Sequence, residues 1–165
     1  MSDANERDTI DQIIRRANAL SAEGNAPEAV REFRRALDLS PENADAHVGL
    51  ALALGEQGHT EEAIREFRGA IQIRADYIMA HFFLAEALRG AGQLDEAIEE
   101  FRKTAVLSPR DADTRMSLGD ALAERGDIDE AKEQYEAALK LAPEDDTIRE
   151  LYELLPPHLK SRRGR

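Results

Sequence analysis

A repeat of 34 residues constrains this chain more than any other feature of its sequence. Four glycines follow one another at this interval: Gly24, Gly58, Gly92 and Gly126. Each is followed by an alanine and then by an aromatic residue at fixed distances: Ala29, Ala63, Ala97 and Ala131, then Phe33, Phe67, Phe101 and Tyr135. So many matching positions in one register predict four structural repeats, at residues 10–43, 44–77, 78–111 and 112–145.

Each repeat is predicted to fold into two helices. In the second repeat, apolar residues recur at helical spacing over residues 48–54 and again over residues 63–71. Gly58 lies between these two stretches, where the end of a helix needs a residue that tolerates a left-handed backbone. Pro41, Pro109 and Pro143 indicate where second helices end, because proline cannot extend a helix without losing a hydrogen bond.

Shorter segments flank the array at residues 10–145. Residues 1–9 are polar and are expected to form a flexible N-terminus. Residues 146–157 are predicted to contain one further helix, whose apolar stripe would cover the open edge of the last repeat. Residues 158–165 form a basic tail.

Composition excludes several classes of function. The net charge of −12 argues against binding to nucleic-acid phosphates or to anionic lipid. The chain has no cysteine, which excludes disulfides, thiolate catalysis and cysteine-ligated metals. No apolar run is long enough to span a bilayer, and the first residues carry no apolar signal segment. We therefore expect a cytoplasmic protein with no nucleic-acid partner and no membrane insertion.

The sequence offers no convincing catalytic or metal-binding residues. His47 and His81 occupy the same position in neighbouring repeats, so they are translated copies that do not face each other, and packing is the expected role of both. The sequence contains no phosphate-binding loop, no zinc-protease motif and no nucleophile elbow. Acidic pairs at helix starts are explained by the helix dipole. We expect no enzyme activity, no cofactor and no metal site.

The repeat resembles the tetratricopeptide repeat (TPR), which has a period of 34 residues and the signature W-x2-L-G-x2-Y…A-x3-F…P. The third and fourth repeats carry the resemblance most clearly: Leu84, Leu88, Ala97, Phe101 and Pro109, then Leu118, Gly119, Ala131, Tyr135 and Pro143. The tryptophan position departs from the signature, because it holds Ile13, His47, His81 and Arg115. The resemblance implies an all-α fold, a right-handed α-solenoid of four helix-turn-helix repeats with a C-terminal capping helix.

The resemblance also implies a binding surface, because in this family the first helices line a concave groove that holds a peptide or a partner's helix. The 34-residue repeat shows which residues of this chain correspond to the groove positions of the family. They fall at four equivalent positions in each repeat, and a few further residues lie beside them. The implied groove residues are Asp11, Ile14, Asn18, Asp45, Val48, Leu52, Tyr77, Met79, Phe82, Phe83, Glu86, Arg89, Asp113, Met116 and Asp120.

These residues form an apolar stripe with carboxylates on either side. The expected partner is therefore a protein or peptide with apolar anchors and basic flanks. Phe82 and Phe83 are adjacent and cannot both face the same interior, so at least one is expected to be exposed. The alternative is that the apolar residues bury against neighbouring first helices and never meet a ligand.

Two functions follow from this surface. The first is an adaptor or scaffold that binds a partner peptide or helix in the acid-rimmed groove. The second is a self-assembling homo-oligomeric scaffold, in which a terminal segment of one copy occupies the groove of the next.

Overall fold

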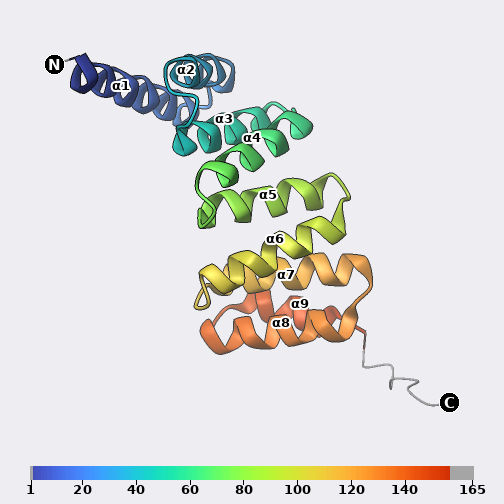
Figure 1. Cartoon of the computed structure of the whole chain (residues 1–165). Coiled ribbons are helices and arrows are strands. Elements are labelled where there is room, and N and C mark those ends of the chain that lie inside the picture. The colour runs from blue at the N-terminus through green and yellow to red at the C-terminus, as the bar shows by residue number, and fades with distance from the viewer. Residues whose placement is uncertain (1, 157–165) are drawn as a thin grey trace. The chain divides into compact units, whose positions relative to one another are not determined.

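The computed structural model describes the backbone of residues 2–156 and the side chains of residues 9–156 (Figure 1). All regular structure among these residues is helical, which confirms the predicted all-α fold. The described helices are α1 (Ser2–Ala22), α2 (Ala26–Leu39), α3 (Ala44–Glu56), α4 (Thr60–Ile73), α5 (Ile78–Gly90), α6 (Leu94–Leu107), α7 (Ala112–Arg125), α8 (Ile128–Leu141) and α9 (Asp146–Leu154). The predicted basic tail lies outside the described residues.

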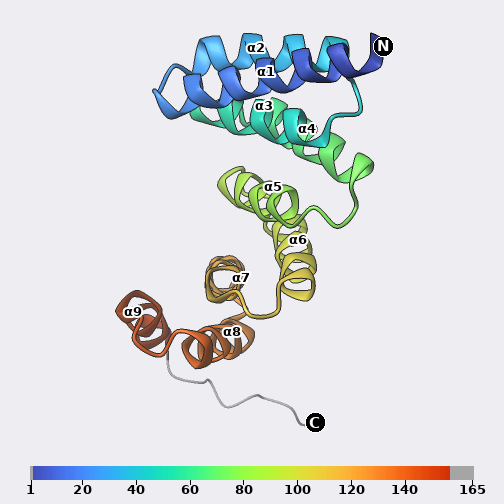
Figure 2. The same ribbon diagram turned by 90° about the vertical axis from the view of Figure 1, so that its left-hand side faces the viewer.

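The helices belong to two compact units, residues 1–87 and residues 88–165. In the first unit α1 packs against α2, α2 against α3, and α3 against α4. In the second unit α6 packs against α7, α7 against α8, and α8 against α9 (Figure 2). In each of these pairs, helices that follow one another in the sequence are neighbours in space.

Glycine ends the first helix of each pair. Gly24, Gly58, Gly92 and Gly126 have φ angles of 76°, 77°, 76° and 97°, in the left-handed region predicted for them. The next backbone N–H donates to a carbonyl one turn back inside the helix, as in His59 to Leu54 at 2.9 Å. Such a bond satisfies a carbonyl that the end of a helix otherwise leaves without a partner.

The repeated apolar positions form the core. The aromatic positions Phe33, Phe67, Phe101 and Tyr135 are all buried, and so are the alanines four residues before them. Small alanines let neighbouring helices approach closely, and the aromatic rings fill the space between them.

The N-terminus differs from the expectation. Residues 1–9 were predicted to lie outside the first helix, but α1 begins at Ser2. Residues 2–9 contain neither proline nor glycine, and acidic residues near a helix N-terminus favour the helix through its dipole. These features allow the helix to continue backwards from the first repeat.

At the other end, α9 lies against α8 and buries Ile148 completely. Lys132 of α8 occupies the position that holds the buried aliphatic residues Val30, Ile64 and Ile98 in the other repeats. Its Nζ donates to the carbonyl oxygen of Pro156, at 2.5 Å. The lysine stem is buried while its ammonium group binds the backbone that leaves α9.

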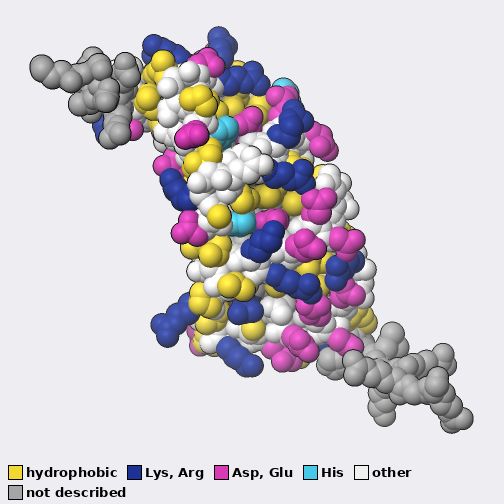
Figure 3. All heavy atoms as spheres, in the orientation of Figure 1, with side chains coloured by type: hydrophobic (Ala, Val, Ile, Leu, Met, Phe, Trp, Pro, Cys, Tyr) yellow, Lys and Arg dark blue, Asp and Glu magenta, His cyan; other side chains and the backbone are white. Residues whose placement is uncertain are grey.

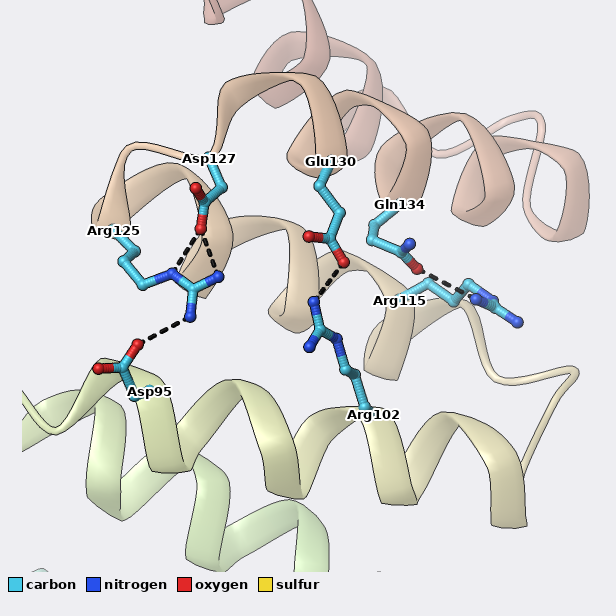
Figure 4. A network of polar contacts seen from close by, with 7 residues as sticks. All are labelled: Asp95, Arg102, Arg115, Arg125, Asp127, Glu130 and Gln134. Atoms are coloured by element: carbon cyan, nitrogen blue, oxygen red, sulfur yellow. Dashed lines mark hydrogen bonds and ion pairs between the residues drawn. The ribbon is translucent and has the colours of Figure 1, made fainter.

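Polar contacts join α6, α7 and α8 (Figure 4). Arg102 of α6 donates to Glu130 of α8 at 2.5 Å, and Arg115 of α7 donates to Gln134 of α8 at 3.1 Å. In the first unit Arg34 and Glu62, at positions equivalent to Arg102 and Glu130, form the same contact at 3.2 Å. A partly exposed ion pair contributes at most about 1 kcal/mol to the free energy of unfolding. The main effect of these pairs is therefore to fix the position of one second helix relative to the next.

Candidate functional site

The predicted groove residues lie on the first helices of both units. In the first unit they are Asp11, Ile14 and Asn18 on α1, Asp45, Val48 and Leu52 on α3, Tyr77 before α5, and Met79, Phe82, Phe83 and Glu86 on α5. In the second unit they are Arg89 on α5 and Asp113, Met116 and Asp120 on α7. In the first unit, α1 and α3 also contact each other directly.

The apolar candidates differ in how much of their surface remains accessible. Met79 is 49 % exposed, and Ile14, Leu52 and Met116 are half-buried. Val48 is only 3 % exposed and cannot serve as a direct anchor for a ligand. Its position on α3, which packs against α1, α2 and α4, explains this burial. The burial of Val48 matches the alternative, in which an apolar residue of a first helix packs against neighbouring helices.

Phe82 and Phe83 also differ from expectation. At least one of them was expected to be exposed, but both are half-buried. Phe83 stacks on Phe67 of α4, with ring centroids 6.2 Å apart and planes inclined by 18°. The rings of Phe82 and Phe83 pack edge to face, with centroids 5.5 Å apart. The two rings therefore cover one another, with Phe83 continuing the core at α4.

Asp45 is part of a polar cluster at the start of α5. It accepts a hydrogen bond from the Tyr77 hydroxyl at 2.6 Å and two from the Arg74 guanidinium at 3.3 and 3.4 Å. The Arg74 guanidinium lies 4.3 Å from the centre of the Tyr77 ring, in cation–π contact. The Tyr77 and Arg74 hydrogen bonds lower the pKa of Asp45, against the opposing effect of its partial burial. Burial, followed by the contact with Asp45, raises the pKa of Tyr77 to about 12.

Arg74 was not among the predicted site residues, although the sequence contains a signal for this cluster. The residues equivalent to Arg74 are Ser40, Ser108 and Ala142, and those equivalent to Tyr77 are Asn43, Asp111 and Asp145. Asn43 and Asp111 cap the N-termini of α3 and α7 with their side chains. Two departures from the repeat pattern within four residues therefore mark the cluster.

In the second unit, two predicted site residues form polar contacts with other side chains. Asp120 accepts a hydrogen bond from the Tyr135 hydroxyl at 2.5 Å. Burial and this contact raise the pKa of Tyr135. Arg89 forms an ion pair with Glu124 at 2.7 Å. Asp113 is exposed on the first turn of α7.

The histidines contact the protein itself. His47 Nδ1 lies 2.7 Å from Glu66 and its Nε2 lies 2.9 Å from the Pro41 carbonyl oxygen. His81 is buried, and its Nε2 lies 3.0 Å from the Ala75 carbonyl oxygen. Among the described residues, no group of three or more His, Cys, Asp or Glu residues could hold a metal ion. In the same part of the chain, no helix has the length and apolar character needed to cross a membrane.

Comparison with known proteins places this chain in a family. Two family models, both described as tetratricopeptide repeat, match it, one over residues 14–78 and the other over residues 54–105 and 88–155. The chain belongs to the tetratricopeptide repeat family. This result confirms the resemblance read from the repeated Gly, Ala and aromatic positions.

Solved structures of similar fold include TPR proteins of bacteria. The structure of MamA 41-end from Desulfovibrio magneticus RS-1 is 19 % identical and has a TM-score of 0.83, with coverage of 88 % of this chain and 82 % of that one. A crystal structure of MamA is 22 % identical, with a TM-score of 0.79 and coverage of 84 % and 81 %. The pilF protein of Pseudomonas aeruginosa is 22 % identical, with a TM-score of 0.78 and coverage of 87 % and 66 %. No protein of curated function matches in sequence.

At these identities the structural likeness concerns the TPR fold alone. Membership of the TPR family supports a role as a protein-interaction scaffold, and members of the family are typically not enzymes. The first helices of this TPR chain carry half-buried apolar side chains and exposed carboxylates, which suit recognition of another protein chain.

Proposed function

We propose that this TPR protein is an adaptor that binds a peptide or helix of a partner protein through the surface of its first helices. The observation that carries the proposal is the exposure of Met79 on α5, beside the half-buried Phe82 of the same helix, together with the half-buried Leu52 on α3. Apolar side chains on adjacent first helices can bury the apolar anchors of a ligand, and this burial supplies most of the binding free energy.

Exposed carboxylates on the first helices of each unit set the charge of the ligand that the unit would bind. Asp11 and Asp113 are exposed, and the described residues provide no ion-pair partner for either of them. Asp45 is already neutralised by Arg74, so a basic ligand residue would have to displace that arginine. We therefore assign ligand contacts to Asp11 and Asp113 ahead of Asp45. The net charge of −12 would also accelerate the approach of a basic segment.

The experiment compares capture of a partner by the parent and by two variants. Phe82→Ala with Met79→Ser should weaken binding, with about 2 kcal/mol lost for Phe82 if it is a central anchor. The matched control is Ile73→Ser, because Ile73 on α4 has an exposure similar to that of Met79 but lies on a second helix. Asp113→Lys should mainly slow association with a basic partner.

Binding of a purified partner with equal affinity to the parent and to the Phe82/Met79 variant would refute the proposal. Light scattering across protein concentration tests the competing function of self-assembly. Growth of the molecular mass without any partner would favour self-assembly over an adaptor.

A further inference from the structure

The segment of residues 74–79, which joins α4 to α5 and begins α5, departs from the repeat pattern at every position. It reads R-A-D-Y-I-M, whereas residues 40–45 read S-P-E-N-A-D and residues 108–113 read S-P-R-D-A-D. Those two segments lead into α3 and α7, which are first helices like α5. The same turn is thus built with other residues, so the fold does not require the ones at 74–79.

Helix stability does not explain the departure either. Asn43 and Asp111 cap α3 and α7 with their side chains. Tyr77 takes this position before α5, and its hydroxyl donates to Asp45 of α3 instead. The change therefore replaces a residue type that stabilises the start of a helix by one that contacts a neighbouring helix.

Two of the changes place apolar side chains on the surface at the start of α5. Met79 stands where the second and fourth repeats have Asp45 and Asp113, and Ile78 stands where both have alanine. Met79 is 49 % exposed and Ile78 is 39 % exposed. The start of α5 therefore lacks the carboxylate of its equivalents and offers an apolar contact in its place.

A third change, Arg74, neutralises a carboxylate of the preceding repeat. Ion pairs as such are common on this protein, since basic and acidic side chains lie interspersed on the face that Figure 3 shows. The pair of Arg74 with Asp45 differs because the equivalent carboxylates, Asp11 and Asp113, have no ion-pair partner among the described residues. The residues that correspond to Arg74 in these two places are uncharged: Ser40 for Asp11 and Ala142 for Asp113.

The geometry of the cluster makes Arg74 the exchangeable partner of Asp45. Its two contacts with the carboxylate, at 3.3 and 3.4 Å, are longer than the roughly 2.7–2.9 Å typical of charge-assisted hydrogen bonds. The Tyr77 hydroxyl lies closer, at 2.6 Å. The side chains of Arg74 and Asp45 are 45 % and 57 % exposed, so a ligand can reach both. A cation from a ligand can therefore replace Arg74 while Tyr77 continues to hold the carboxylate.

We propose that Arg74 is a specificity-determining residue of the first-helix surface, where its guanidinium takes the place of a basic ligand residue on Asp45. The inference rests on the proposed function and narrows the ligand. The part of the ligand that crosses the start of α5 is uncharged and apolar, in contact with Ile78 and Met79, and its basic residues lie toward Asp11. A ligand with Lys or Arg at the start of α5 has to displace Arg74, which weakens its binding.

The test uses fluorescence anisotropy with a labelled synthetic helix of about four turns, with Leu at i, i+3, i+4 and i+7 and Lys on both flanks. A twin peptide has Gln in place of every Lys. The protein variant is Arg74→Ser, which copies the residue at the equivalent positions Ser40 and Ser108 and should fold normally, as circular dichroism would verify. The matched control is Arg65→Ser, which removes the same charge from an exposed arginine within α4.

We expect Arg74→Ser to lower the Kd of the Lys peptide by about threefold to fivefold, because competition from an exposed ion pair is lost. The Kd of the Gln twin should stay within about 1.5-fold of the parent value, and Arg65→Ser should leave both peptides within the same range. Adding Asp45→Asn to Arg74→Ser should abolish the gain, because the gain requires the carboxylate that Arg74 masks.

An unchanged or raised Kd of the Lys peptide in Arg74→Ser would overturn the inference. An equal gain in Arg65→Ser, or a gain that persists with Asp45→Asn, would do the same, because the effect would then come from net charge alone. The proposed function is judged separately, by weaker binding of both peptides to the Phe82/Met79 variant. If that weakening is seen while Arg74→Ser has no effect, the adaptor function stands and the role of Arg74 is refuted. If neither peptide binds the parent or Arg74→Ser, both are refuted.

Discussion

Replacing Gly49 with alanine should destabilise the protein, although alanine is normally the better residue inside a helix. Gly49 lies in α3, where that helix approaches Phe33 of α2. A Cβ atom at this position would lie 2.3 Å from both Cε1 and Cζ of the Phe33 ring. Phe33 is almost completely buried, so its ring has no free space into which it could turn.

The magnitude follows from two opposing terms. Overpacking of a filled core costs about 1–3 kcal/mol, and an overlap with a buried ring belongs at the upper end of this range. The gain in helix propensity from glycine to alanine offsets about 1 kcal/mol. The free energy of unfolding should therefore fall by roughly 2 kcal/mol. With an m value of about 2 kcal/mol/M, the urea midpoint should fall by roughly 1 M.

Gly55 provides the matched control in the same helix. A Cβ atom at Gly55 would have no neighbour within 4 Å, so Gly55→Ala should show only the gain in propensity. We expect it to stabilise the protein by up to about 1 kcal/mol. The assay is urea unfolding followed by circular dichroism at 222 nm, with the m value compared among the parent and both variants. The same substitution should thus have opposite effects at two positions of one helix.

A Gly49→Ala variant as stable as the parent would refute the reasoning, because it would mean that the α2–α3 contact has room for a methyl group. Combining Gly49→Ala with Phe33→Leu checks the assigned cause. If the ring is the obstacle, the double variant should lose less stability than the sum of the two single losses.

Two further predictions concern the core and the tyrosines. Truncation of the completely buried Phe101 to alanine should cost about 3–5 kcal/mol in urea unfolding, and a loss under about 1 kcal/mol would show that the aromatic position is not core. In the folded protein the pKa values of all three tyrosines are raised, that of Tyr77 to about 12, so the tyrosinate absorbance of Tyr77 should appear near pH 12 and not near pH 10. Because a raised pKa means tighter binding of the proton in the folded state, the resulting stability is present below pH 10 and is lost as the pH rises through 12. Tyr77→Phe should remove the tyrosinate step near pH 12, and an unchanged titration curve in this variant would contradict the assignment.

The sequence by itself determined the helices of the repeats and the composition of the core, but not the N-terminal extension of α1 to Ser2. Glycines that recur every 34 residues require a left-handed backbone, and the apolar positions between them have the period of a helix. These are local properties of the chain, so they could be predicted without knowing which helices meet. The 34-residue repeat also identified Phe33 and its equivalent aromatic residues as core positions, and all of them are buried.

Only the tertiary structure decided which first-helix residues remain accessible. Val48 and Leu52 have the same residue class and the same expected face, but Val48 is buried between neighbouring helices while Leu52 is not. The contact of Phe83 with Phe67 joins two helices, and the pairing of Asp45 with Arg74 joins α3 to the residue that follows α4. Accessibility and pairing depend on which side chains neighbouring helices bring to one place, and the periodicity of a single chain segment does not contain that information.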